Sequence, residues 1–590
     1  MRYRGMFVLS LMAMLAACSV SAPSEDDDEL AAETSSSKKY SSSSSKDEDS
    51  SDKDEDKKSS AKETSKSSSS KSNGKSSSSK AVDQSSNGND SEKSSSSKAS
   101  SSSSKENSSS SVKSSSSSTK KQDDECVGEI GNPWDGTTAK AFACGAGTKL
   151  SPYIILNAEQ LAKLSFAIGA SDADYQGKYF KLGADIILNE GKIIDDKGAL
   201  VADSTRLHKW TPIGNSSVAF TGTFDGDGHT VSGMFINTTS THNGLFGNSS
   251  GTVQNVTVAD SWVSGGNYTA GVVGRNIGTV ASVMNLASVL GKDECVGGII
   301  GSSYRKGTSV NSVIRNVVNR GNVVGNKNVG GVAGCATGVT VEFAENYVQI
   351  EGYGYVGGVL GGIGASSNNE VRNLKNYGDV YGKHFVGGIS GHCGGSAQIY
   401  SGANISSTYS CYDFYSCGKV LSQAYNEGNV IGLRYVGGIV GEVCYGTISN
   451  LVNRGDVSGE GGTGGIASSM SYTKTSSVYN TGNISGKNYV GGIIGYNQEG
   501  VTSSAYSTGK VDGDSLVGLM IGYNYNTTMA DYYYLDQGEQ DPFGLNNGGG
   551  VATPKSADEM KSQNFAELLG DDFVYDSGVN DGFPVLKWER

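Results

Sequence analysis

The feature that most constrains the fold is a short phrase, Val-Gly-Gly-(Ile/Val)-x-Gly, which returns throughout residues 242–524. Full or degenerate copies start at His242, Thr269, Val296, Val329, Val356, Val386, Val436, Thr463, Val490 and Val517. Six of the nine spacings between copies are 27 residues, and the longest, 50, carries an insertion around 401–417. A fixed period of roughly 20–50 residues indicates a solenoid or a propeller, whose units bury their apolar faces against one another.

A second motif, Asn-x-Gly-(Asn/Asp)-(Val/Ile)-x-Gly, keeps the same period. Its leading asparagines are Asn319, Asn376, Asn426, Asn453 and Asn480, and Asn346 and Ser507 occupy this position in weaker copies. Asn tolerates the left-handed conformation, and the Gly two residues later supplies the rest of a turn. We expect a tight corner here, with the asparagines of successive units stacked into an amide ladder.

The composition of the repeat selects among solenoids. Helical repeats need apolar spacing of 3.6 residues and few glycines, leucine-rich repeats need a Leu scaffold, and propeller blades are usually longer. A parallel β-helix remains, because 27 extended residues have a contour of roughly 90 Å, enough for three short strands and their turns. We therefore predict an all-β solenoid of about ten 27-residue coils with short helical caps.

The rest of the chain divides around this solenoid. We predict a signal peptide at 1–17 and a Ser-rich disordered tether at 18–125, because the tether has almost nothing to bury. An N-terminal cap and the first coils follow at 126–241, with a helix capped by Asn157. The repeats occupy 242–524, and a C-terminal cap with short helices occupies 525–590.

The N-terminus has Arg2 and Arg4, an apolar run and small residues, which is typical of a secretory signal. Its end, Leu15-Ala16-Ala17-Cys18, resembles the lipobox of bacterial lipoproteins. That resemblance implies cleavage before Cys18 and acylation of its thiol, for example with palmitate, which would be the membrane attachment. Ser19 follows instead of Asp, so the resemblance favours the outer membrane, facing the cell exterior. The acidic run at 25–29 could be a surface-export tag, but we favour the interpretation that it is a solvated charged stretch.

Removing Cys18 leaves eight cysteines, an even number that suits disulfides in an oxidising compartment. The local pairs that we expect are Cys126 with Cys144 and Cys411 with Cys417, although spacing alone does not fix the connectivity.

The glycine-rich phrases resemble the GLUG motif of bacterial surface and secreted proteins. The stretches "PYIILNAEQLAKLS", "FTGTFDGDGHTVSGMFIN" and the closing "DGFPVLKW" are similar to those of such proteins and occur in the same order. The resemblance covers roughly residues 150–590 and implies a right-handed β-helix at a cell surface. It implies little about activity, because function resides in sites and not in folds.

The sequence shows no motif for catalysis, a metal or a cofactor. It lacks His-Glu-x-x-His, Gly-x-Ser-x-Gly and the calcium-binding nonapeptide, and its formal net charge of -13 argues against nucleic acid. A polysaccharide lyase or hydrolase would use carboxylates such as Asp225 and Asp227 beside His229, or Asp379 and Asp456. All four carboxylates fit turn positions better. The Cys and His of "GHCGGS" at 392–396 read as structural residues of a repeat copy.

A recurrent aromatic residue precedes the glycine phrase, and the members of this row are Tyr268, Tyr355, Phe385, Tyr435 and Tyr489. Stacked coils would align them into a stripe that contacts sugar rings or a protein, or into a ladder that only stabilises the stack. We predict a lipid-anchored binding or adhesion module, not an enzyme, that contacts polysaccharide or a surface partner. The alternatives are a carbohydrate-active enzyme and a structural envelope protein.

Overall fold

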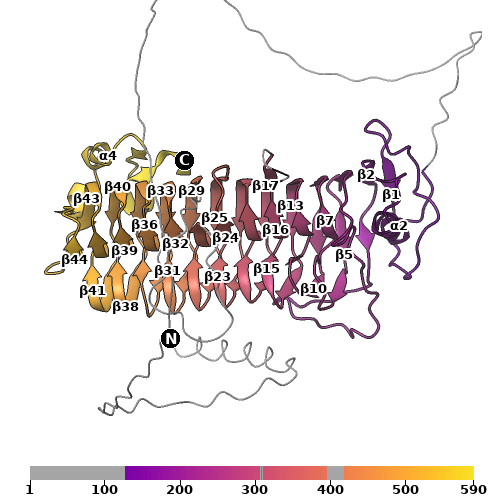
Figure 1. Ribbon diagram of the computed structural model, residues 1–590, viewed down its shortest axis with the longest axis horizontal. Helices are drawn as coiled ribbons and strands as arrows, with labels where there is room; N and C mark the ends of the chain where they lie inside the picture. Colours follow the sequence, from indigo (N-terminus) through magenta and orange to yellow (C-terminus); the bar gives the residue numbers. More distant parts are fainter. Residues whose placement is uncertain (1–125, 306, 308–309, 395–417) are drawn as a thin grey trace, which may run out of the picture. The chain divides into compact units, whose positions relative to one another are not determined.

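The computed structural model describes residues 126–590 except 306, 308–309 and 395–417. These residues form a parallel β-solenoid whose coils pass through three sheets, which confirms the predicted fold class (Figure 1). The predicted signal peptide, tether and lipidation site Cys18, and the predicted pair Cys411 and Cys417, lie outside the described residues.

The first sheet carries the strands that end at the asparagine motif. It contains β1 (Tyr153–Ile155), β2 (Tyr179–Leu182), β3 (Ile186–Ile187), β4 (Thr223–Asp225), β5 (Thr230–Ser232), β8 (Thr252–Gln254), β9 (Thr257–Ala259), β13 (Thr279–Asn285), β17 (Ser312–Asn319), β21 (Val339–Asn346), β25 (Glu370–Asn376), β29 (Gly418–Asn426), β33 (Gly446–Asn453), β37 (Lys474–Asn480), β40 (Val501–Ser507), β43 (Thr528–Leu535) and β45 (Thr553–Lys555).

The second sheet leads from that motif to the glycine phrase. It contains β6 (Phe235–Asn237), β10 (Trp262–Gly265), β11 (Thr269–Ala270), β14 (Ser288–Gly291), β15 (Glu294–Gly297), β18 (Val323–Val324), β19 (Lys327–Gly330), β22 (Ile350–Glu351), β23 (Gly354–Gly357), β26 (Val380–Tyr381), β27 (His384–Gly387), β30 (Val430–Ile431), β31 (Arg434–Gly437), β34 (Val457–Ser458), β35 (Thr463–Gly464), β38 (Ile484–Gly491) and β41 (Val511–Gly518).

The third sheet follows the glycine phrase and closes each coil. It contains β7 (Phe246–Ser249), β12 (Val273–Asn276), β16 (Ile300–Tyr304), β20 (Ala333–Thr337), β24 (Leu360–Gly364), β28 (Ser390–Gly394), β32 (Val440–Cys444), β36 (Ala467–Ser471), β39 (Ile494–Gln498), β42 (Ile521–Tyr525) and β44 (Phe543–Asn547). Its eleven strands exceed the ten predicted coils, because the coil that ends at β44 lacks the phrase. In the first sheet, β1, β2 and β4 extend the stack further at the N-terminal end.

Successive coils pair in parallel at the period of the phrase. Val436 pairs with Thr463, Thr463 with Val490, and Val490 with Val517. The valines of the phrase point into one continuous apolar core. The apolar residues of each copy therefore lie over those of the next copy.

The asparagine motif forms the expected amide ladder. Asn453 donates through Nδ2 to Oδ1 of Asn480 at 2.8 Å and to the carbonyl of Gly455 at 2.8 Å, while its own Oδ1 accepts from Asn426 at 2.8 Å. The same pair of bonds recurs at the other full rungs, which are Asn285, Asn319, Asn346, Asn376 and Asn426. Every rung is fully buried, so the ladder is part of the core.

The torsional explanation predicted for this motif is wrong. The ladder asparagines are not left-handed; positive φ falls three residues earlier, as at Asn450 with φ 58° and Ser477 with φ 57°. The residue two positions after each ladder asparagine must be glycine because the backbone of the preceding coil lies close to it, and not because of its own torsion angles. A Cβ on Gly455 would lie 2.0 Å from the carbonyl oxygen of Gly428 in the preceding coil.

The second glycine of the phrase makes room for the ladder. A Cβ on Gly438 would lie 2.1 Å from the carbonyl oxygen of Gly465 and 2.4 Å from Cγ of Asn453. A Cβ on Gly437 would lie 2.0 Å from the carbonyl oxygen of Val440. The two motifs are thus parts of one packing arrangement inside the coil.

Helix α2 (Ala158–Gly169) lies at the N-terminal end of the solenoid (Figure 1). Asn157 accepts from the backbone N–H of Gln160, as the capping pattern predicts. Leu161, Leu164 and Ile168 join the main core, so the helix closes its N-terminal end.

The C-terminal segment, residues 556–590, packs along the side of the first sheet. It contains α3 (Ala557–Met560), α4 (Gln563–Leu569), β46 (Phe573–Val574), the 3₁₀ turns η1 (Asn580–Gly582) and η2 (Lys587–Glu589), and β47 (Val585–Leu586). Phe565, Phe573 and Leu586 form a separate apolar cluster with Tyr479 and Tyr506 of the sheet. Within the predicted cap, 525–555 continue the coils and 556–590 cover a lateral face.

Disulfides join Cys126 to Cys144 and Cys295 to Cys335. The second links adjacent coils at the corner between the second and third sheets. Cys393 and Cys444 are also disulfide-bonded.

Candidate functional site

The five aromatic residues singled out in the sequence share one backbone position. All have positive φ, between 54° and 59°, at the corner between the second and third sheets. A single left-handed residue within a strand re-aims its side chain out of the regular alternation, while the pairing on either side stays in register.

These aromatics do not form one continuous stripe. Phe385 stacks on Tyr355 with centroids 4.9 Å apart and on Tyr435 with centroids 4.6 Å apart. Tyr355 and Phe385 are only 5% and 2% exposed, so their ring faces are covered by the neighbouring rings of the stack. Tyr268 contacts the ring of His242, while Tyr489 is 39% exposed and meets different neighbours.

The last coils carry what we call the tyrosine cluster, which has two parts. The first is a group of contacting rings, Tyr489, Tyr496, Tyr523 and Tyr525. The second is the stacked pair of Tyr445 and Tyr472 in the preceding coils. Tyr489 meets Tyr496 and Tyr523 edge-on, with interplanar angles of 84° and 90°. Tyr496 and Tyr523 stack with centroids 5.2 Å apart. The members come from β38, β39 and β42 and from the turns that follow β32 and β36.

The cluster presents both ring surface and hydroxyl groups. Tyr472, Tyr489 and Tyr525 are exposed, whereas the other three are half-buried and support them. Burial, together with the nearby hydroxyls of Tyr523 and Tyr489, raises the pKa of Tyr496, so this phenol stays protonated at neutral pH. Rigid aromatic side chains with polar tips are suited to binding sugars or protein surfaces.

Sequence reasoning found Tyr489 and missed the other members. Tyr496 and Tyr523 follow the phrase, in "IGYNQ" and "IGYNY", and face outward from the third sheet. The outward position of these tyrosines in two adjacent copies could have identified them. Recognising that position requires the strand register.

The carboxylates considered for catalysis are engaged in local structure. Asp225 accepts from Gln254, Asn255 and the backbone N–H of Asp227. Burial opposes ionisation of Asp225, but these hydrogen bonds outweigh it and lower its pKa. Asp227 pairs with Lys181 at 2.8 Å, and Asp185 lies 3.2 Å from His229. This arrangement fits the turn reading of the sequence.

Asp379 and Asp456 belong to a second ladder at the corner between the first and second sheets. Asp379 accepts from both the backbone and the side-chain amide of Asn429, and Asp456 does the same with Asn483. Asn429 in turn accepts from the backbone N–H of Asp456 at 3.2 Å. These carboxylates hold coils together.

His392, from the "GHCGGS" phrase, is buried beside Glu442, with Nδ1 3.3 Å from a carboxylate oxygen. Its ring contacts the Tyr355 and Phe385 rings. Cys393, the neighbouring residue, is disulfide-bonded. The two side chains therefore do not form a thiolate–imidazole pair.

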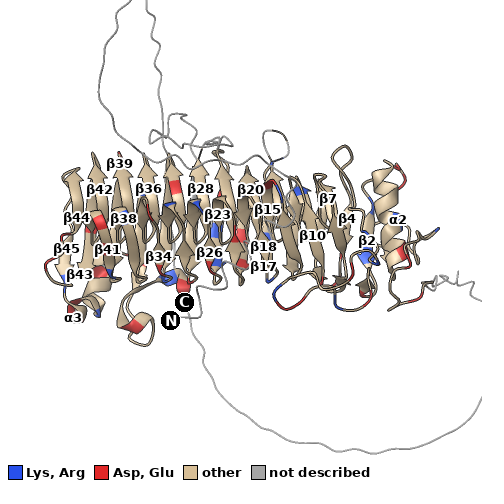
Figure 2. Ribbon diagram, turned by 90° about the horizontal axis from the view of Figure 1, so that it is seen from below, with Lys and Arg blue, Asp and Glu red and all other residues tan. Residues whose placement is uncertain are grey.

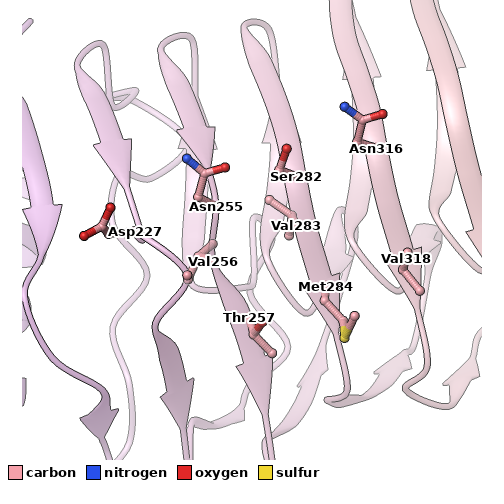
Figure 3. Close-up of a pocket in the computed structure, with 10 residues that line it drawn as sticks. Asp227, Asn255, Val256, Thr257, Ser282, Val283, Met284, Asn316 and Val318 are labelled. Atoms are coloured by element: carbon pink, nitrogen blue, oxygen red, sulfur yellow. The ribbon is translucent and has the colours of Figure 1, made fainter. Parts of the chain in front are cut away.

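A shallow groove crosses the first sheet near its N-terminal end (Figure 3). Its polar row contains Asn255, Ser282 and Asn316, all with positive φ. Its other row contains Thr257, Met284 and Val318, which pair with one another across the coils. Asp227 lies at the end of the groove, where it is paired with Lys181.

Charged residues are sparse along the coils (Figure 2). Across residues 126–590, gaps excepted, no group of three or more His, Cys, Asp or Glu residues is arranged to hold a metal ion. In the same part of the chain, no helix is both long and apolar enough to cross a membrane.

Comparisons with known proteins give partial matches. No protein-family model matches the chain. "Halomucin" of Haloquadratum walsbyi is 35% identical over 187 residues, which are 30% of this chain. A "Putative Gly-rich membrane protein" of Evansella cellulosilytica is 30% identical over 151 residues, or 25% of this chain. The matches span only 2% and 16% of those two proteins.

Among solved structures, the chain is similar to a "putative immunoglobulin A1 protease" from Bacteroides ovatus. The match covers 76% of this chain and 96% of that one, at 17% identity and a TM-score of 0.26. At that score the likeness carries no argument about this chain.

Proposed function

We propose that this chain is a cell-surface binding module in which the β-solenoid displays the tyrosine cluster to uncharged polysaccharide. The observation that carries the proposal is the gathering of six tyrosines over the last coils, three of them exposed. Aromatic rings bind the apolar faces of sugar rings, and phenol hydroxyls bind their oxygens. The net charge of -13 disfavours acidic polymers as ligands.

The proposal includes attachment to the outer membrane through a lipid on Cys18. It is supported by the lipobox-like sequence before Cys18 and by the Ser-rich stretch that follows. One partial relative is named as a membrane protein, which supports a place in the cell envelope. Membership of the GLUG-containing surface proteins belongs to the same proposal and is supported by the repeated phrases.

Binding is tested with the full chain on a panel of uncharged plant and microbial polysaccharides, scoring retention and released chain ends separately. We expect retention on at least one polymer and a loss of about tenfold or more in affinity for the double variant Tyr489→Ala/Tyr523→Ala. Phe343→Ala, which removes an aromatic ring that is 54% exposed on the first sheet, serves as the matched control and retains binding.

Retention by no polymer, or equal loss in the control, would rule out the tyrosine cluster as a sugar site. Released chain ends would replace the proposal with a polysaccharide enzyme. Display is tested by protease treatment of intact cells. Cleavage of the chain only after lysis contradicts an outward-facing location.

A further inference from the structure

The open groove and the surface under the C-terminal segment are two parts of the same sheet face. Outward positions are in register from Met284 through Val318, Glu345, Lys375, Tyr425 and Val452 to Tyr479 and Tyr506. The positions of the polar row follow the same register, so that Ser282 in the groove is equivalent to Ser477 under the segment. Between them the row is interrupted by the exposed ring of Phe343, which follows Asn316. The groove therefore continues a surface on which a polypeptide is already seated.

The C-terminal segment shows what this surface accepts. Phe565 and Phe573 pack on the rings of Tyr506 and Tyr479 in the outward row. In the polar row, the hydroxyl of Ser477 donates to a carboxylate oxygen of Asp572 at 2.6 Å. The segment thus places apolar side chains over the outward row and a hydrogen-bond acceptor over the polar row.

The groove offers the same two rows without a cover. Ser282 is exposed, and Met284 and Val318 are partly exposed (Figure 3). Ser282 matches Ser477 in residue type as well as position. Partly exposed apolar side chains beside an exposed hydroxyl reproduce, in the groove, the surface that the segment buries elsewhere.

We propose that the groove binds a polypeptide segment of a partner protein, which places apolar side chains over Met284 and Val318 and a carboxylate beside Ser282. This site is distinct from the tyrosine cluster, because it lies on the first sheet and lacks aromatic rings for sugar stacking. The inference therefore goes beyond the proposed function and does not depend on it.

The occupant is not the C-terminal segment of a second copy. That segment is held by Glu589, which accepts from the Tyr479 hydroxyl at 2.8 Å and pairs with Arg454 at 2.9 Å, and by the carbonyl of Pro584, which accepts from Tyr506. Met284 and Val318 stand where those tyrosines would be and have no hydroxyl to donate. The proposal therefore assigns the groove to a partner of different sequence.

The test pans a library of random displayed peptides on the immobilised full chain. Peptides that carry apolar residues together with Asp or Glu should be enriched on the wild type. Their affinity should fall about tenfold or more with Met284→Lys/Val318→Lys and with Ser282→Asp, which repels a carboxylate. Val501→Lys places the same charge on a residue that is 48% exposed elsewhere on this sheet and should leave binding unchanged.

Three results would overturn the proposal. The first is the absence of any peptide whose binding depends on the groove. The second is a concentration-dependent dimer in sedimentation that disappears with Met284→Lys/Val318→Lys, which makes a second copy the occupant. The third is oligosaccharide binding lost in that variant but kept in Tyr489→Ala/Tyr523→Ala. If the lysine variant does not fold, Ser282→Asp, which changes an exposed serine, decides the outcome.

Discussion

At the scale of single residues, the buried asparagines serve as polar core residues. Each amide satisfies its own hydrogen-bonding groups with the next rung and with a carbonyl two residues ahead. A fully connected polar network is compatible with a dry core, whereas a broken one leaves unpaired groups there. The ladder therefore makes the stacking of coils depend on every rung.

Replacing Asn453 by Ala should lower the free energy of unfolding by about 2–3 kcal/mol, because the amide of Asn426 loses its acceptor in the core. The denaturant midpoint measures the effect. Asn488→Ala removes an exposed amide of β38 and should change stability by less than about 0.5 kcal/mol. Equal effects of the two substitutions would contradict a structural role of the ladder.

A substitution at Gly438 tests the close packing between adjacent coils. Gly438→Ala should destabilise the chain by about 3 kcal/mol or more, because its Cβ would lie 2.1 Å from a carbonyl oxygen that cannot move without shifting a coil. Thermal unfolding measures the loss. Gly169→Ala at the end of α2 is the control, since its Cβ would meet its nearest neighbour at 3.9 Å. An unchanged melting temperature of Gly438→Ala would show that the coils can accommodate a Cβ at this position.

His242 gives a pH dependence. Burial, with a smaller effect of the Arg275 charge, lowers its pKa below the usual 6.5, and its Nε2 is buried without a partner. The unfolded chain then takes up a proton that the folded chain does not, so stability present above pH 6.5 is lost as the pH falls through the folded pKa.

Denaturation at pH 7.5 and at lower pH should show this loss, and His242→Asn, which tolerates the left-handed backbone, should reduce its slope. Gly169→Ala, which changes no titratable group, should leave the slope as in the wild type. An identical slope for His242→Asn would assign the acid sensitivity to other groups.

At the scale of elements, the C-terminal segment is attached by one apolar cluster and a few polar bonds. Phe565→Ala should cost about 3–5 kcal/mol of attachment and release residues 556–590, while the coils before them stay folded. Limited proteolysis should then cleave within 556–590 first. Phe343→Ala, which removes an exposed ring, should leave the digestion pattern unchanged. Cooperative unfolding and digestion of the whole chain would show that the segment is an integral part of the solenoid.

The element scale also shows where sequence reasoning succeeded and failed. The 27-residue period predicted parallel stacking and the asparagine ladder, because in-register repetition places identical residues over one another. It did not predict that the ladder is buried. It gave the wrong reason for Gly455, because a close approach to Gly428 is a property of two coils and not of one turn. The tyrosine cluster escaped prediction because its members come from several strand positions, and only the fold brings Tyr489 beside Tyr523.

At the scale of the described molecule, stability arises from contacts between adjacent coils. A solenoid of this kind behaves as a chain of nearest-neighbour interactions, so its ends are its weakest points. Helix α2 closes the N-terminal end of the core. Outward-facing side chains on the first and third sheets can then change without affecting the core, because strand residues alternate between interior and exterior.

The second ladder, at the corner between the first and second sheets, alternates between acid and amide: Asp379, Asn429, Asp456 and Asn483. Each carboxylate lies against an amide that donates to it, and never against another carboxylate. Duplication of the single coil that contains Asp456 would place two carboxylates in contact and remove that donor. Insertion of that coil together with the coil that carries Asn483 would keep an acid next to an amide at every step, so a two-coil insertion should be tolerated better than insertion of the Asp456 coil alone.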